Sequence, residues 1–164
     1  MRKQRKQKSF ITGAGCLRTV REYFPHVEEV LDGTKVTIVE VTQQDNAHAD
    51  VKSHRTCAMA IASKRCFKAD GAIIGLTVSF IIFGKTAYRY MNPGTVSREI
   101  TSFDRKAGFD VGIYHLAPPS DAHRLGTERI TDPDRPSGSK KKAVGKYRHF
   151  TKGVRTTLGN VGVS

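Results

Sequence analysis

Residues 73–82 read IIGLTVSFII, and this is the stretch of the chain in which apolar side chains alternate most regularly. Alternation with a period of two is typical of a β-strand, because successive side chains point to opposite faces of a sheet. Gly84 and Lys85 follow, and residues 86–91 (TAYRYM) are again rich in residues that favour strands. The pattern predicts one strand over residues 73–82, joined by a hairpin at Gly84 and Lys85 to a second strand over residues 86–91.

Two further elements are predicted on the N-terminal side of this hairpin. Apolar residues recur at roughly helical spacing over residues 17–31, and Asp32 and Gly33 end the pattern. Pro25 interrupts it, so we expect either a kinked helix or two short helices. Residues 35–41 (KVTIVEV) alternate and are rich in β-branched side chains, which predicts a strand.

A central helix is predicted over residues 50–67, with Asp45 or Asn46 as its cap. Small side chains in this helix allow close packing on a sheet, and they are Ala58, Ala60 and Ala62.

The C-terminal part of the core predicts one more helix and one more strand. Four apolar residues share one helical face: Val96, Ile100, Phe103 and Ala107. Thr95 is the expected N-cap and Gly108 the expected stop. A last strand is predicted over residues 109–116, closed by Pro118 and Pro119. This mixture predicts an α+β fold in which a mostly antiparallel sheet is covered by helices.

The charge of the chain is concentrated at its two ends. The net charge is +13, and residues 1–8 and 135–164 contain five and eight basic residues with no acid, which accounts for the whole excess. Residues 9–134 hold equal numbers of basic and acidic residues and are neutral. We expect a flexible basic N-terminal arm over residues 1–13, an α+β core domain over residues 14–134, and a basic extended C-terminal arm over residues 135–164.

These two arms are the predicted nucleic-acid-binding elements. Clustered Lys and Arg side chains neutralise phosphates and release counterions, and they need no fixed geometry to do so. Aromatic residues among the cations of the C-terminal arm are expected to stack on unpaired bases. The alternatives are a solvated tail or a sorting signal, whereas membrane docking is disfavoured because the arms lack a bulky apolar face. The expected nucleic-acid-binding residues are Arg2, Lys3, Arg5, Lys6, Lys8, Lys140, Lys141, Lys142, Lys146, Tyr147, Arg148, Phe150, Lys152 and Arg155.

Two groups of residues bear on metal binding and catalysis. His54 and Cys57 have the spacing of a shared metal site, with His48 and Cys66 in the same region, but zinc sites usually take two close pairs of ligands. Carboxylates and imidazoles near the last strand would suit metal-assisted or acid–base hydrolysis, although nothing in the sequence fixes their mutual geometry. These residues are Asp104, Asp110, His115, Asp121 and His123. We expect no catalytic residue, no metal site and no cofactor.

The predicted central helix also carries a cluster of basic residues, with Asp50 and Asp70 as the nearby acids. Arg89 on the hairpin is expected to add to this cationic face. Such a face is either a local docking surface or, more commonly, ordinary solvated helix surface. Its members are Lys52, Arg55, Lys64, Arg65 and Lys68.

Residues 36–120 resemble a group of small uncharacterised tailed-phage proteins. The resemblance is carried by a strand followed by Thr42-x-x-Asp45, then by the helical segment 57–62 (CAMAIA) closed by Lys64 and Arg65, and by residues 102–105 (SFDR) ahead of the last strand. It implies a viral origin and no particular activity. Both basic arms are departures from this group.

Several classes of protein are disfavoured. The longest apolar run is interrupted by Thr, Ser and Gly, so no transmembrane span is expected. Residues 1–8 are charged, unlike a secretory signal peptide, and three cysteines are an odd count for a disulfide scaffold. The expected location is intracellular (cytoplasmic) or virion-associated.

The sequence thus predicts a non-enzymatic, largely sequence-independent nucleic-acid-binding protein, with RNA favoured over DNA. Its expected partners are a nucleic-acid backbone and, in addition, other copies of the chain or viral proteins, with no membrane. One alternative is a viral or phage virion or assembly protein whose arms contact the genome. A second alternative is a small metal-dependent nuclease.

Overall fold

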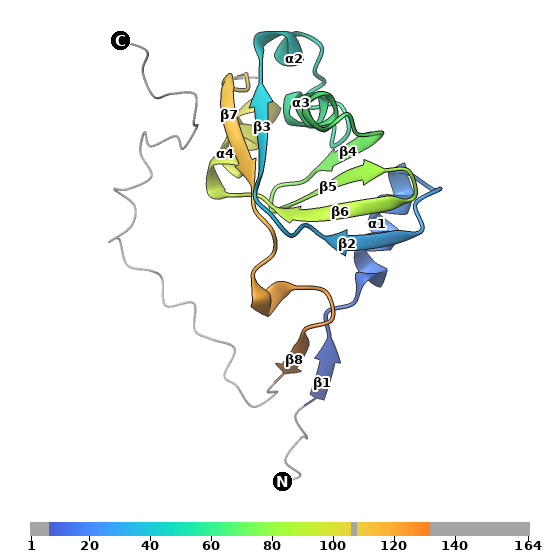
Figure 1. Ribbon diagram of the computed structural model, residues 1–164. Helices are drawn as coiled ribbons and strands as arrows, with labels where there is room; N and C mark the ends of the chain where they lie inside the picture. The colour runs from blue at the N-terminus through green and yellow to red at the C-terminus, as the bar shows by residue number, and fades with distance from the viewer. Residues whose placement is uncertain (1–6, 106–107, 132–164) are drawn as a thin grey trace, which may run out of the picture.

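The computed structural model describes residues 7–105 and 108–131 (Figure 1). The helices are α1 (Gly13–Tyr23), α2 (Gln43–Ala47), α3 (Ala58–Phe67) and α4 (Gly94–Asp104), with one short 3-10 helix at Asp121–His123. The strands are β1 (Gln7–Phe10), β2 (Glu29–Asp32), β3 (Thr37–Val41), β4 (Gly71–Ile74), β5 (Val78–Phe83), β6 (Thr86–Met91), β7 (Gly112–Leu116) and β8 (Glu128–Thr131). The predicted α+β class is confirmed.

The largest sheet is mixed. Its four strands have the order β2-β6-β5-β4, in which β2 runs parallel to β6 and the other neighbours are antiparallel. Strands β3 and β7 form a separate antiparallel pair, which is linked to the end of β6 by a bridge between Met91 and Ala117. Strands β1 and β8 form a third, antiparallel pair.

Both faces of the four-stranded sheet are buried. On one face, Ile74 and Ile81 join a core cluster with the alanines of α3 and with Val96 of α4. On the other face, Phe80 and Ile82 pack in a second cluster that contains Val20 of α1. Each fully buried large aliphatic side chain contributes about 1.5–3 kcal/mol to the free energy of folding. Packing on both faces explains why β4 and β5 are almost uniformly apolar.

Residues 73–82 form a hairpin and not the single predicted strand. Strand β4 ends at Ile74 and β5 begins at Val78, and the Gly75 amide donates to the Val78 carbonyl at 2.9 Å. Asn92, distant in sequence, closes this turn, because its Nδ2 donates to the Gly75 carbonyl at 2.6 Å and its amide donates to Thr77. The period-two pattern continues through the turn, so the alternation alone does not reveal the reversal.

The region of residues 17–31 also differs from its prediction. Helix α1 ends at Tyr23, two residues before Pro25. No second helix follows; Glu29–Asp32 forms β2 instead, because its backbone pairs in parallel with β6 and Val30 is buried. A long-range pairing therefore overrides the local helical spacing.

The central helix is shorter than predicted. Thr42 is the N-cap of the separate short helix α2, and Asp45 is the third residue of that helix in a reciprocal capping box. Helix α3 begins only at Ala58, after turns in which the Asp50 amide donates to the Thr56 carbonyl. Its three predicted packing residues, Ala58, Ala60 and Ala62, are fully buried.

The remaining elements lie near their predicted positions. The β5–β6 hairpin turns at Gly84, whose φ of +54° suits glycine. Strands β3 and β7 lie within their predicted ranges. Helix α4 buries Val96, Ile100 and Phe103 as expected, whereas Ala107 lies outside the described residues. The N-cap is Pro93 and not the predicted Thr95, and the helix ends at Asp104, before the predicted stop at Gly108. Among the described residues, no helix is both long and apolar enough to cross a membrane.

Candidate functional site

The predicted nucleic-acid-binding residues lie outside the described residues, apart from the backbone of Lys8. Lys8 belongs to β1, where it pairs with Ile130 of β8. The ladder continues past the strands, because the Ile11 amide donates to the Thr127 carbonyl at 3.0 Å. Residues 7–10 are thus a strand, and the expected flexible arm over residues 1–13 does not extend over them.

The pair β1–β8, named here the terminal ribbon, brings the two ends of the described chain together. Gln7 lies opposite Thr131, so residues 1–6 and residues 132–164 are joined to the same end of the ribbon. Figure 1 shows the ribbon projecting from the body of the fold, on the side away from α2 and α3. The two basic segments of the sequence therefore share one point of attachment.

A buried ion pair fixes the base of the terminal ribbon. Arg89 Nε on β6 donates to Asp32 Oδ1 on β2 at 2.6 Å, and the two side chains are 9% and 14% exposed. The second oxygen, Asp32 Oδ2, accepts from the Leu125 amide at 2.7 Å. Arg89 Nη2 donates to the His123 carbonyl at 2.7 Å. The segment that leads into β8 is thus held to the sheet by both members of the pair.

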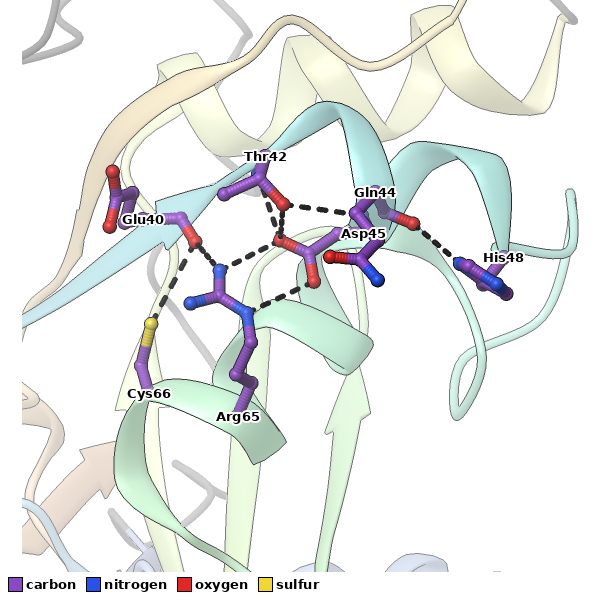
Figure 2. A network of polar contacts seen from close by, with 7 residues as sticks. All are labelled: Glu40, Thr42, Gln44, Asp45, His48, Arg65 and Cys66. Carbon is purple, nitrogen blue, oxygen red and sulfur yellow. Dashed lines mark hydrogen bonds and ion pairs between the residues drawn. The ribbon is translucent and has the colours of Figure 1, made fainter.

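A second polar network joins α2 to α3 (Figure 2). Arg65 binds the carboxylate of Asp45 through two nitrogens, at 2.8 and 3.2 Å, and donates to the Glu40 carbonyl at 2.6 Å. Burial by itself raises the pKa of Asp45, but hydrogen bonds from Arg65 and Thr42 outweigh it, so the pKa lies below its ordinary value. Both carboxylate oxygens of Asp45 thus accept hydrogen bonds from Arg65, and one also accepts from Thr42, which is typical of a structural network.

Three arginines of the predicted cationic face make contacts within the protein, although Arg55 and Arg65 stay exposed. Arg65 is paired with Asp45, and the guanidinium of Arg55 lies 5.7 Å from the centre of the Phe24 ring. The expectation that Arg89 adds to this face is wrong, because Arg89 is buried against Asp32. The exposed lysines that remain are Lys52, Lys64 and Lys68.

The acidic and histidine residues near the last strand are engaged in separate contacts and do not form one cluster. Asp104 accepts from the Lys52 amide, Asp121 pairs with Arg124, and His123 contacts the Ser120 hydroxyl. Asp110 donates its amide to Glu99, while His115 lies opposite Ile38 in the β3–β7 pair. Within residues 7–105 and 108–131, no three His, Cys, Asp or Glu side chains are grouped so that they could hold a metal ion.

His54 and Cys57 do lie beside a common cavity of about 190 Å³. Burial raises the pKa of the Cys57 thiol to about 11, so it is protonated at neutral pH and is a poor nucleophile or metal ligand. His54 Nδ1 contacts the Ile74 carbonyl at 2.9 Å. His48 and Cys66 make their own backbone contacts, to Gln44 and Glu40, in the network of Figure 2.

Two larger hollows adjoin this cavity. One, of about 240 Å³, shares His54 with it and is walled by α1 and the β4–β5 turn. The other, of about 630 Å³, shares Lys52 and Asp104 with it and is also lined by Leu76, Thr101 and Arg105. The sequence places Lys52, His54 and Asp104 in separate candidate groups, and their common location depends on residues 50–57 being a loop and not the predicted helix.

The buried pair of Arg89 and Asp32 was also missed. A signal for it exists in β6, where Ala87 and Arg89 occupy alternate positions and both are buried. An arginine at an inward position of a strand requires a buried acceptor.

No family model, curated protein or solved structure matches this chain. The resemblance of residues 36–120 to small tailed-phage proteins stays a prediction.

Proposed function

We propose that this protein is a non-enzymatic nucleic-acid-binding protein, anchored by its cationic ends and largely indifferent to sequence. The proposal rests on the location of the charge: the excess of +13 falls on residues 1–8 and 135–164, and the rest of the chain is neutral. The pairing of Gln7 with Thr131 attaches both segments at one end of the terminal ribbon. Lys and Arg contacts to phosphate give affinity without reading bases.

RNA is favoured over DNA as the partner. Tyr147 and Phe150 lie among the lysines and arginines of the C-terminal segment. Aromatic side chains stack on unpaired bases, which are more accessible in folded RNA than in duplex DNA. The core then acts as a neutral platform from which the extended basic arms of the proposal reach the polymer.

A salt titration of the full chain tests this function. The affinity for a single-stranded RNA and for a duplex DNA is measured from low to moderate salt. The variants change the lysines and arginines of residues 1–6 and 135–164 to glutamine, which removes charge and keeps the terminal ribbon. Affinity falls as salt rises, and each lost phosphate contact reduces the steepness of log affinity against log salt by about 0.7 on a single strand and about 0.9 on duplex DNA. A slope that does not change on neutralisation overturns the proposal.

Exposed apolar side chains on and beside the β3–β7 pair favour a second candidate function, a virion or assembly protein. Val36, Ile38 and Val111 are each more than two-fifths exposed on or beside these strands. Exposed apolar patches mark sites of contact between proteins. Sedimentation of the chain without nucleic acid tests this candidate, since a symmetric assembly that forms without a polymer supports it and a monomer opposes it.

A further inference from the structure

Lys52 has a left-handed backbone conformation although it does not cap a helix. Its φ is +59°, in the left-handed region that residues with side chains rarely adopt. The other such non-glycine residue in the described chain is Lys68, which is the C-cap of α3, where this conformation commonly ends a helix. Lys52 lies between α2 and α3, and its amide donates to Asp104 Oδ1 at 2.9 Å. The end of α4 therefore holds a strained lysine in place, and such strain is common at binding sites.

Lys52 and Asp104 form the boundary between two hollows. The larger, of about 630 Å³, lies within the usual size range of ligand sites. The smaller, of about 190 Å³, extends it towards His54 and the apolar side chains Ile74 and Ile100. We name the two together the Lys52 cleft.

The chemistry of the Lys52 cleft combines cations with an apolar wall. Lys52 and Arg105 supply positive charge, and Leu76, which is 54% exposed, supplies an apolar surface. One carboxylate, Asp104, faces the same space. Lys and Arg are the side chains that bind phosphate groups, and an apolar side chain packs on the face of a base.

His54, which lines the smaller of the two hollows, adds an acceptor to this region. Its Nδ1 lies 2.9 Å from the Ile74 carbonyl, which can only accept, so Nδ1 carries the proton of the hydrogen bond. In the neutral ring, Nε2 is then left as an acceptor. An acceptor in this position suits an amino or hydroxyl group, which bases and ribose both offer.

We propose that the Lys52 cleft binds a single nucleotide, with its phosphate between Lys52 and Arg105 and its base against Leu76. If the nucleotide is one unit of a bound polymer, this inference rests on the proposed function. The site itself is distinct from the terminal segments. The cleft holds one defined unit, whereas the segments hold the backbone at many phosphates.

To test this, the full chain is titrated at moderate salt with adenosine monophosphate and, separately, with inorganic phosphate. Binding is measured by calorimetry and by changes in backbone NMR chemical shifts. Lys52→Gln and Arg105→Gln each remove a charged hydrogen-bond donor and are expected to weaken nucleotide binding about tenfold. Asp104→Asn keeps an acceptor oxygen for the Lys52 amide and removes the negative charge, so it is expected to bind more tightly. Lys64→Gln, an exposed lysine outside the cleft, is the control and is expected to bind as the unaltered chain does.

Misfolding cannot weaken nucleotide binding in Lys52→Gln and strengthen it in Asp104→Asn, so opposite changes in affinity support the cleft. Nucleotide binding that is unchanged in all the cleft variants overturns the cleft, even if the salt titration supports the terminal segments. Inorganic phosphate bound as tightly as the nucleotide also overturns it. Nucleotide binding in the cleft of a chain that binds no polymer supports the cleft and contradicts the proposed function instead.

Discussion

Arg89 and Asp32 lie on neighbouring parallel strands and form an ion pair at 2.6 Å, with both side chains largely shielded from solvent. Each residue also holds the backbone of the segment that leads to the terminal ribbon, Arg89 at His123 and Asp32 at Leu125. The pair thus links the interior of the sheet to the place where the two basic segments attach. Its loss is therefore expected to affect the position of the ribbon as well as the stability of the fold.

Breaking this pair by one side chain is expected to be costly. Arg89→Met or Asp32→Asn leaves the other group buried with fewer partners, and each is expected to lower the free energy of unfolding by about 3 kcal/mol, measured by urea denaturation. The double variant is expected to lose less than the sum of the two single variants.

The exposed pair of Lys85 and Glu28 provides the control for this prediction, because both side chains are in solvent. Lys85→Ala is expected to change stability little. Equal losses in Lys85→Ala and Arg89→Met would show that burial of the Arg89 pair has no special effect.

Gly33, next to Asp32, is predicted to tolerate no side chain. A Cβ at this position would overlap the ring of Tyr90, which packs directly on the backbone. Gly33→Ala is expected to destabilise the protein by about 1–3 kcal/mol in thermal or urea unfolding, because the ring has to move. Gly15 of α1 is the matched control, since a Cβ there meets nothing within 4 Å. Gly15→Ala is expected to be neutral or stabilising, and a similar loss in both variants would contradict the steric argument.

The sequence predicts local elements well and distant contacts poorly. The β5–β6 hairpin follows from Gly84 and two flanking apolar runs, and α4 follows from the spacing of Val96, Ile100 and Phe103. The turn at Gly75 depends on Asn92, and β2 depends on its pairing with β6. Neither partner is visible in a local pattern.

The same limit applies to the candidate sites. The concentration of charge at the chain ends is visible in the sequence, but their common attachment depends on β8, a strand that no alternation predicts. The Lys52 cleft depends on a left-handed residue and on a hydrogen bond across 52 positions of the sequence.

Protonation of Asp45 in acid is expected to lower the stability of the fold. The pKa of this carboxyl is lowered from its ordinary value of 3.8, so the folded state binds its proton less readily than the unfolded chain. The stabilisation is therefore complete well above pH 3.8, and it is lost as the pH falls through 3.8 towards the folded pKa. Urea unfolding of Asp45→Asn is expected to vary less between pH 6 and pH 3 than that of the unaltered chain.

Glu28 is the comparison for this pH effect. The hydrogen bond from Lys85 also lowers the pKa of Glu28, but both groups are exposed, and solvent screens their attraction. Glu28→Gln is expected to keep most of the pH dependence. If Glu28→Gln and Asp45→Asn had the same effect, the network around Arg65 would not be the source of the acid sensitivity.

Alkylation is predicted to distinguish Cys57, the N-cap of α3, from Cys66 within the helix by their rates of reaction. Cys57 is buried, and burial raises its pKa to about 11, so almost no thiolate forms near pH 8. Cys66 is exposed. Iodoacetamide followed by mass spectrometry is expected to modify Cys66 within minutes and Cys57 only after denaturation. Modification of Cys57 at the rate of Cys66 in the folded protein would show that its cavity opens readily to solvent.

The terminal ribbon is predicted to make the two basic segments act together. The Ile11 amide bonds to Thr127, and hydrogen-bonded pairs alternate along an antiparallel ladder, so Ser9 opposite Arg129 is also a donor in the ladder. Ser9→Pro removes this donor and is expected to separate the strands without changing the charge of the chain. Two linked binding segments lose effective concentration when their common attachment is lost, so RNA affinity at fixed salt is expected to fall about tenfold. Ser9→Ala keeps the amide and is the control; equal affinities of the two variants would show that the segments bind independently of the ribbon.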